Sequence, residues 1–204
     1  TIFLTPDVDF KIEIDKAISN SKIKILKNYI YDTNPTKLTK QIENITRYEI
    51  RKQNLEDEII RLEKSEQANK ERLIERLKKR DTLGNVNFDA VVISDFDESL
   101  KSVTTSLLYT DVSPKKKYFI TLNQWFDESL IKETSSQPLY FPSANKNNYD
   151  DFSSEYFEKY NQYPNQLSFL SYDLVGLIYF LILQNNFILD KKIFSKKTLF
   201  KGKI

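Results

Sequence analysis

The sequence contains no cysteine, no histidine and no methionine, and only three glycines among its 204 residues. Without cysteine and histidine the chain has no disulfide, no thiol nucleophile, no Ser-His or Cys-His relay, and none of the nitrogen and sulfur ligands that zinc prefers. The glycines at 84, 176 and 202 cannot form a dinucleotide-binding fingerprint or a phosphate-binding Walker loop. These absences exclude most metal, acyl-transfer and nucleotide-dependent chemistry, and we expect no cofactor.

The chain also lacks an excess of either charge. It carries 31 Lys and Arg against 29 Asp and Glu, a net charge of +2, which gives little overall field to attract a polyanion. The basic stretches at 115–117 and 191–203 carry no interleaved aromatic platform, so we interpret them as solvated surface and expect no nucleic-acid partner. The opening Thr1-Ile2-Phe3-Leu4, without a methionine, is typical of an excised piece, and any signal peptide or lipid anchor would lie upstream of it.

Five short apolar stretches alternate with helical patterns along the chain. They cover residues 2–4, 23–31, 88–93, 118–121 and 139–141. Strands that alternate with helices predict βαβ units and a mainly parallel sheet. Residues 88–93 are nearly all apolar at their centre, which predicts a strand in the middle of that sheet. We therefore expect an α/β fold, a three-layer αβα lobe over residues 1–204, interrupted by a helical insertion at about 35–83.

The insertion is marked by its helical signals. Asn34 and Pro35 are typical of a helix cap and first helical residue, and Gly84 of a helix end. Leucine and isoleucine recur at three- and four-residue steps between them, which predicts an amphipathic, coiled-coil-like helix. A straight helix of roughly 45 residues would be about 68 Å long, whereas a compact domain of this size is roughly 45 Å across. Because the apolar stripe lapses over residues 63–72, we expect the helix to project into solvent or to turn back as a hairpin.

Two helices are predicted near the C-terminus, at about 150–160 and 167–183. The second is strongly apolar but includes Asp173, and a carboxylate at the centre of a bilayer costs at least ~2.5 kcal/mol. We therefore interpret it as a buried packing helix rather than a membrane span. Burial of Asp173 beside Tyr172 would be costly without partners, so we expect Asp173 to anchor a hydrogen-bond network or to face a cleft.

Acidic residues follow the central predicted strand, where the carboxyl ends of parallel strands converge on a binding crevice. Asp95, Asp97 and Glu98 offer carboxylates there for acid-base work or for a hard cation. The alternative that we favour is that Asp95 or Asp97 caps the next helix.

A second loop brings Asn123, Gln124 and Trp125 to the same predicted edge, after the strand at 118–121. The ring of Trp125 either stacks on a ligand or packs against the neighbouring helix, and we favour packing. No catalytic residue and no metal ligand is assigned. The candidate ligand-binding residues are Asp95, Asn123, Trp125, Tyr172 and Asp173.

Three segments, in this order, resemble the type 1 periplasmic-binding-protein fold. They are Phe88-Asp89-Ala90-Val91-Val92-Ile93, the helix with Phe152, Phe157 and Tyr160 leading to Tyr163-Pro164, and Ser171-Tyr172-Asp173. Leu174 stands where that family usually has alanine. The long charged helix before the first segment is similar to the penicillin-binding-protein activator (LppC-like lipoprotein) branch. The resemblance runs from Thr1 to about Phe187 and covers mainly one lobe of a two-lobed protein.

The resemblance implies a non-enzymatic module of the bacterial cell envelope. It would be exported to the periplasm or anchored to the outer membrane as a lipoprotein through a segment outside this chain, and would modulate a peptidoglycan synthase. Our leading hypothesis is that the long helix is its docking device. The alternative is the substrate-binding protein of an ABC transporter for amino acids or similar small polar solutes, with this chain supplying half of the pocket. A third hypothesis, an enzyme with Asp95 and Asp97 as paired acids, is the least favoured.

Overall fold

The structure is a computed structural model that describes residues 1–22, 24–188, 190–195 and 199–202, and only the backbone of Gln166. Position 23, the first residue of a predicted strand, and positions 196–198 and 203 of the basic C-terminal stretch lie outside the described residues. The chain divides into two compact units, Thr1–Pro142 and Ser143–Ile204. A single lobe over residues 1–204 stays a prediction.

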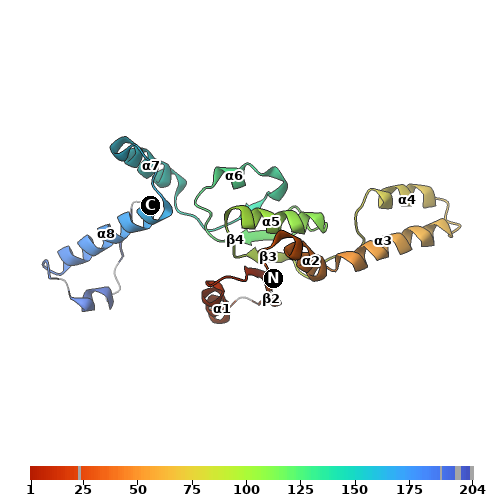
Figure 1. Cartoon of the computed structure of the whole chain (residues 1–204), viewed down its shortest axis with the longest axis horizontal. Helices are drawn as coiled ribbons and strands as arrows, with labels where there is room; N and C mark the ends of the chain where they lie inside the picture. The colour runs from red at the N-terminus through yellow and green to blue at the C-terminus, as the bar shows by residue number, and fades with distance from the viewer. Residues whose placement is uncertain (23, 189, 196–198, 203–204) are drawn as a thin grey trace. The chain divides into compact units, whose positions relative to one another are not determined.

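The first unit is built on a parallel sheet, which confirms the predicted α/β class. Among the described residues the sheet has five strands in the order β2-β1-β3-β4-β5, and every neighbouring pair is parallel. The strands are β1 (Ile2–Pro6), β2 (Lys27–Tyr31), β3 (Ala90–Ile93), β4 (Tyr118–Thr121) and β5 (Leu139–Tyr140). The chain moves from β1 to β2 on one side and then crosses to β3 on the other, so the strand order reverses between β1 and β3. The predicted central strand is β3, in the middle of the sheet (Figure 1).

One face of this sheet carries the hydrophobic core. Helices α2 (Pro35–Thr46), α5 (Asp97–Tyr109) and α6 (Glu128–Ile131) contribute to it, together with the short 3-10 helix η1 (Thr134–Ser136), which contacts α5. The strand residues of the core alternate along each strand, as a pleated sheet requires. They are Ile2, Leu4, Tyr31, Val91, Ile93, Phe119 and Leu139, packed with Leu38, Ile42, Leu100, Val103, Leu107 and Leu130 of the helices.

The opposite face of the sheet is covered differently. Helix α1 (Lys11–Asn20) contacts β1 but has no buried residue of its own. Towards β4 and β5, the rings of Tyr118 and Tyr140 contact each other and are about half exposed. Helices on both sides of the sheet are compatible with the predicted three-layer arrangement.

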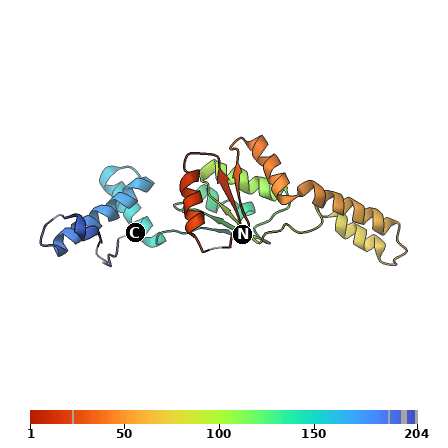
Figure 2. The ribbon, with the colours of Figure 1, turned by 90° about the horizontal axis from the view of Figure 1, so that it is seen from below.

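Residues 35–83, the predicted insertion, form α2, which packs into the core beside the sheet, and then a helical hairpin rather than one unbroken rod. Arg47, in the left-handed conformation with φ 52°, separates α2 from α3 (Tyr48–Glu63), and α4 (Lys70–Lys78) returns alongside α3. The turn falls where the apolar stripe lapses, because residues 64–69 offer no large apolar side chain to continue it. Asn34 caps α2 as predicted, accepting hydrogen bonds from the backbone N–H groups of Thr36 and Lys37. Figure 2 shows α3 and α4 side by side, extending away from the sheet.

The second unit contains two helices, α7 (Lys146–Tyr160) and α8 (Gln166–Gln184), and the short 3-10 helix η2 (Lys191–Ser195). Its buried aromatic residues are Phe152 and Phe169, whose ring centroids lie 5.0 Å apart. Asn145 caps α7 and Asn165 caps α8 through their side-chain oxygens. The aromatic contact packs α8 against α7, and the two caps mark where each helix begins.

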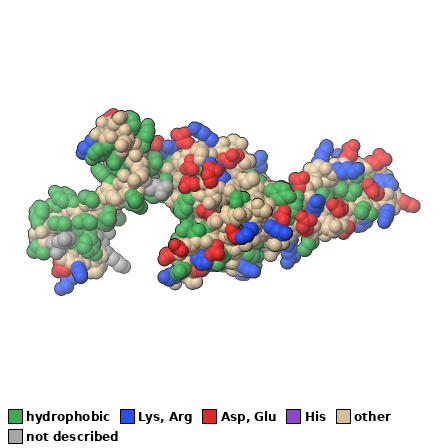
Figure 3. Space-filling model, viewed as in Figure 1, with side chains coloured by type: hydrophobic (Ala, Val, Ile, Leu, Met, Phe, Trp, Pro, Cys, Tyr) green, Lys and Arg blue, Asp and Glu red, His purple; other side chains and the backbone are tan. Residues whose placement is uncertain are grey.

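The interpretation of the second helix as buried is wrong for this unit. Of the described side chains of α8, only Phe169 and Leu181 are buried, while Leu167 is 69% exposed and Val175 66%. The reason is that α7 and η2 are too small to cover an apolar helix on all sides. Figure 3 shows hydrophobic side chains gathered over this unit. Among the described residues, Leu167–Gln184 is also the one stretch long and apolar enough to cross a membrane, judged by length and composition alone.

Candidate functional site

A buried tyrosine–carboxylate pair lies at the carboxyl edge of the sheet. Asp95 follows β3 and is 8% exposed, and its Oδ2 accepts a hydrogen bond from the Tyr31 hydroxyl at 2.5 Å. Its Oδ1 accepts a second hydrogen bond from the Phe96 N–H at 2.9 Å. Tyr31 ends β2, and β1 lies between β2 and β3, so the Tyr31–Asp95 bond passes over the end of β1. The pair therefore spans the point where the strand order reverses.

The surroundings of the pair set its protonation. Burial raises the pKa of Asp95 above its ordinary value, although the hydrogen bonds from Tyr31 and Phe96 act in the opposite direction. Burial, followed by the hydrogen bond to Asp95, raises the pKa of Tyr31 as well. Tyr31 therefore stays protonated and donates, and Asp95 is an acid whose ionised form depends on that donor.

Gln124 ties the next loop to this pair. Its buried amide nitrogen donates to the Asp95 backbone oxygen at 3.0 Å and lies 3.1 Å from the Thr121 hydroxyl oxygen. That hydroxyl donates in turn to the Ile93 backbone oxygen at 2.9 Å. The loops after β3 and β4 are thus held together by hydrogen bonds between buried polar groups. Breaking these hydrogen bonds costs free energy, because the protein interior offers the separated groups no other partner.

The loop after β4 has strained backbone. Trp125 and Phe126 are both left-handed, with φ 49° and 59°, a conformation uncommon for bulky residues. Such residues cost on the order of 1–3 kcal/mol each and persist only where the surroundings hold them. Here the Asn123 side chain accepts a hydrogen bond from the Trp125 N–H at 2.9 Å, and the hydrogen bond from Gln124 to the Asp95 backbone oxygen holds the loop in place. Trp125 and Phe126 are half-buried at this edge.

The capping interpretation of the acids is wrong. Helix α5 begins after Phe96, which makes no side-chain cap hydrogen bond, and Asp95 accepts from the adjacent N–H of Phe96 instead. Asp97 is exposed and left-handed, with φ 48°, and Glu98 pairs with Lys101 at 2.7 Å on the surface. Within the described part of the chain, no group of three or more acidic residues is arranged to hold a metal ion.

The structure brings three of the five predicted site residues to one edge. Asp95, Asn123 and Trp125 lie in the two loops that Gln124 joins. Tyr172 and Asp173 belong to α8 in the second unit, so a common site with the other three stays a prediction. Tyr31 and Thr121 also belong to this cluster but were not predicted, because the local sequence marks each of them only as an ordinary strand residue.

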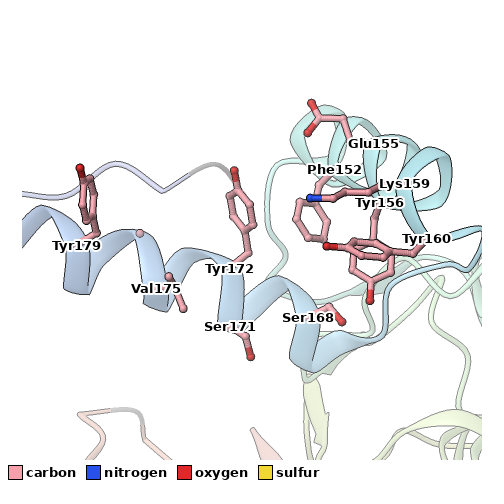
Figure 4. A pocket seen from close by; sticks show the side chains of 11 residues that line it. Phe152, Glu155, Tyr156, Lys159, Tyr160, Ser168, Ser171, Tyr172, Val175 and Tyr179 are labelled. Atoms are coloured by element: carbon pink, nitrogen blue, oxygen red, sulfur yellow. The ribbon is translucent and has the colours of Figure 1, made fainter.

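Tyr172 instead faces a groove within the second unit (Figure 4). The groove has a volume of about 790 Å³ and lies between α7 and α8. The Tyr172 ring meets Phe152 edge-on at 5.0 Å, and Tyr156 and Tyr160 lie 4.6 Å apart on α7. Glu155 and Lys159 are the charged residues that line it. The groove is therefore lined mainly by aromatic rings, together with tyrosine hydroxyl groups, one acidic side chain and one basic side chain.

No protein-family model, curated protein or solved structure matches this chain.

Proposed function

We propose that this chain is a non-enzymatic interaction module of the bacterial envelope. In this proposal it is a type 1 periplasmic-binding-like lobe of the penicillin-binding-protein activator type, and the α3–α4 hairpin docks on a peptidoglycan synthase. The observation that carries the proposal is the way in which the hairpin is rooted in the α/β body. A helical pair held firmly at its base presents its outer part to a partner in a fixed direction.

The root of the hairpin is a buried arginine. Arg51 lies in the first turn of α3 and is 5% exposed. Its Nε donates to the backbone oxygen of Thr46 at 3.0 Å, and a terminal guanidinium nitrogen donates to the backbone oxygen of Thr110. These two carbonyls stand at the C-terminal ends of α2 and α5, where a cation is favoured by the helix dipole. Arg51 thus joins three helices at one point.

Further contacts support the same root. The backbone oxygen of Arg51 accepts a hydrogen bond from the Leu83 N–H at 2.9 Å. The segment that follows α4 is therefore held next to the start of α3. The rings of Tyr48 and Tyr109 lie 5.4 Å apart, one on α3 and one at the end of α5. The hairpin is therefore fixed by both of its ends.

The outer part of the hairpin is available for binding. Leu55 and Leu62 of α3 are buried, whereas α4 has no buried residue and its polar side chains, apart from the half-buried Lys70, are exposed. Packing between α3 and α4 therefore buries few of the hairpin's side chains. That balance favours a docking element over a purely structural insertion.

The remaining features fit the same proposal. The motifs in residues 88–93 and 171–173, in their order, are those that resemble the periplasmic-binding-like family. The exposed apolar side chains of α8 are of the kind that a second lobe would cover. Periplasmic location and outer-membrane anchoring through an upstream segment complete the proposal.

The decisive experiment removes the outer hairpin and keeps its root. Residues 55–80 are replaced by a short Gly-Ser linker, which leaves Arg51 and its hydrogen bonds in place, and Trp125 fluorescence checks that the first unit is folded. Binding to purified peptidoglycan synthase and the rate of glycan polymerisation are then measured. We expect both binding and the effect on the rate to be lost. Unchanged binding by the linker variant would refute the docking role.

A second function, solute binding for an ABC transporter, is favoured by the strained loop at Asn123–Phe126. Strained backbone of this kind is found at ligand clamps as well as in structural turns. Thermal-shift measurements on the full two-lobed protein with amino acids and wall fragments test it, because a ligand that binds only the folded state raises the melting temperature. Substitution of Trp125 by alanine should abolish that rise if the ring contacts the solute, and the absence of any rise would leave the docking proposal alone.

A further inference from the structure

The hairpin carries a groove between its two helices. Its volume is about 320 Å³. Leu62 of α3 and Leu73 and Leu77 of α4 supply apolar side chains to it. The polar residues that line it are Glu58, Arg61, Gln67, Arg76 and Arg80. The groove thus combines an apolar strip with three guanidinium groups.

The charge on the hairpin is divided between its two arms. Residues 48–69, which include α3, carry four basic and six acidic residues, whereas residues 70–80, which include α4, carry six basic and two acidic ones. Arg76, Lys78, Lys79 and Arg80 lie within five consecutive positions and are all exposed. The second arm is therefore the basic side of an otherwise nearly neutral protein.

The arginines of the groove differ in their pairing. Arg61 forms an ion pair with Glu58 at 2.6 Å, and this pair raises the pKa of Arg61. Arg76 and Arg80 have no ion pair within the described part of the chain. Two guanidinium groups are consequently free to bind carboxylates, for which their planar geometry is well suited.

We propose that this groove binds an acidic amphipathic helix of a protein partner, with leucine-type side chains on the apolar strip and carboxylates on Arg76 and Arg80. The inference rests on the proposed docking function and specifies the chemistry of its partner. A helix laid in an apolar groove is a common mode of recognition, and charge complementarity adds orientation and a faster encounter.

The geometry disfavours two other anionic partners. A continuous phosphate backbone would approach Glu58 and the acidic arm of the hairpin, and it would leave the leucines without an apolar partner. A bilayer surface is too broad to enter a groove of this size. A single helix with apolar and acidic faces meets both features of the groove at once.

The test uses a synthetic amphipathic peptide with glutamate and leucine at helical spacing, and a twin with glutamine in place of every glutamate. Binding to the full chain is measured by fluorescence anisotropy. We expect the acidic peptide to bind, the twin to bind at least about tenfold more weakly, and about 1 M salt, where the screening length is about 3 Å, to abolish the difference.

Three double variants locate the interaction. R76E/R80E should weaken binding of the acidic peptide by about tenfold, which corresponds to about 1.4 kcal/mol. K52E/K64E makes the same change of charge on exposed residues of the same hairpin, outside the groove, and should change the affinity less than about twofold. R76Q/R80Q, which removes the charges without placing acids near the end of α4, should give an intermediate loss. Circular dichroism checks that all three variants are folded.

Several outcomes would overturn the proposal. Equal loss in R76E/R80E and K52E/K64E would show a general charge effect, and equal binding of the two peptides would show that the carboxylates are not read. Binding to phosphatidylglycerol vesicles or to duplex DNA without binding to the peptide would assign the arginines to another partner. If R76E/R80E binds the synthase normally and the linker variant does not, the docking function stands and only this assignment of the groove fails.

Discussion

Removal of the Arg51 guanidinium should destabilise the first unit strongly. Arg51→Ala deletes two hydrogen bonds from a charged donor and leaves the carbonyls of Thr46 and Thr110 without that partner. Each such bond contributes about 1.5–3 kcal/mol. Burial lowers the pKa of Arg51, so the charge already carries a desolvation cost, and relief of that cost offsets part of the loss. We therefore expect a net destabilisation of about 3 kcal/mol.

The assay follows the only tryptophan. Trp125 lies in the first unit, so its fluorescence during urea unfolding reports that unit and not the second. With a denaturant slope of about 2 kcal/mol per molar, a loss of about 3 kcal/mol moves the unfolding midpoint down by about 1.5 M. Arg51→Lys keeps the charge but not the planar guanidinium group, and its unfolding midpoint should lie about halfway between those of the native chain and Arg51→Ala. The exposed neighbour Lys52→Ala is the control, with a change within about 0.5 kcal/mol.

An unfolding midpoint for Arg51→Ala that coincides with that of Lys52→Ala would refute the expected destabilisation. Such a result would mean that water replaces the guanidinium at both carbonyls, and that the hairpin is not rooted by Arg51. It would also remove the observation on which the docking function rests.

The structure makes four further predictions. Tyr31→Phe should cost about 2 kcal/mol at neutral pH in the same urea assay, because it removes a hydrogen bond to a buried carboxylate. Burial raises the folded pKa of Asp95, so its contribution is complete below the unfolded pKa of about 4 and is lost as the pH rises through the folded pKa. The stability of the native chain relative to Asp95→Asn should therefore fall as the pH rises above ~4, and a difference that rises with pH would contradict the sign. Asn34→Ala should lower stability by about 1 kcal/mol through loss of the α2 cap, whereas Asn34→Gly should lower it by a few tenths, and equal losses would show that the side chain does not cap. In the second unit, Phe169→Ala should cost about 3 kcal/mol as measured by the helical circular dichroism signal, and its neighbour Leu170→Ala, which is 57% exposed, less than about 0.5 kcal/mol; similar losses would contradict the packing of α8.

Local patterns predicted the elements of the first unit well, because strands and helix starts are specified over a few residues. The apolar run at 88–93 and its neighbours marked the parallel sheet, and Asn34-Pro35 marked the start of α2. The turn between α3 and α4 was one of two alternatives, since a lapse in apolar side chains shows where a helix cannot pack but not whether it folds back. Asp95 was identified as a residue of the edge, but its role as a cap was wrong.

By itself, then, the sequence determined the class of the fold and the position of β3, both of which depend on the spacing of nearby residues. Only the tertiary structure decided which distant groups meet. Tyr31 reaches Asp95 across 64 positions, and Arg51 reaches Thr110 across 59. Such contacts depend on strand order and helix crossing, which no local periodicity encodes. The exposure of α8 was likewise a matter of tertiary structure, because burial depends on how much surface the rest of the unit offers to cover an apolar helix.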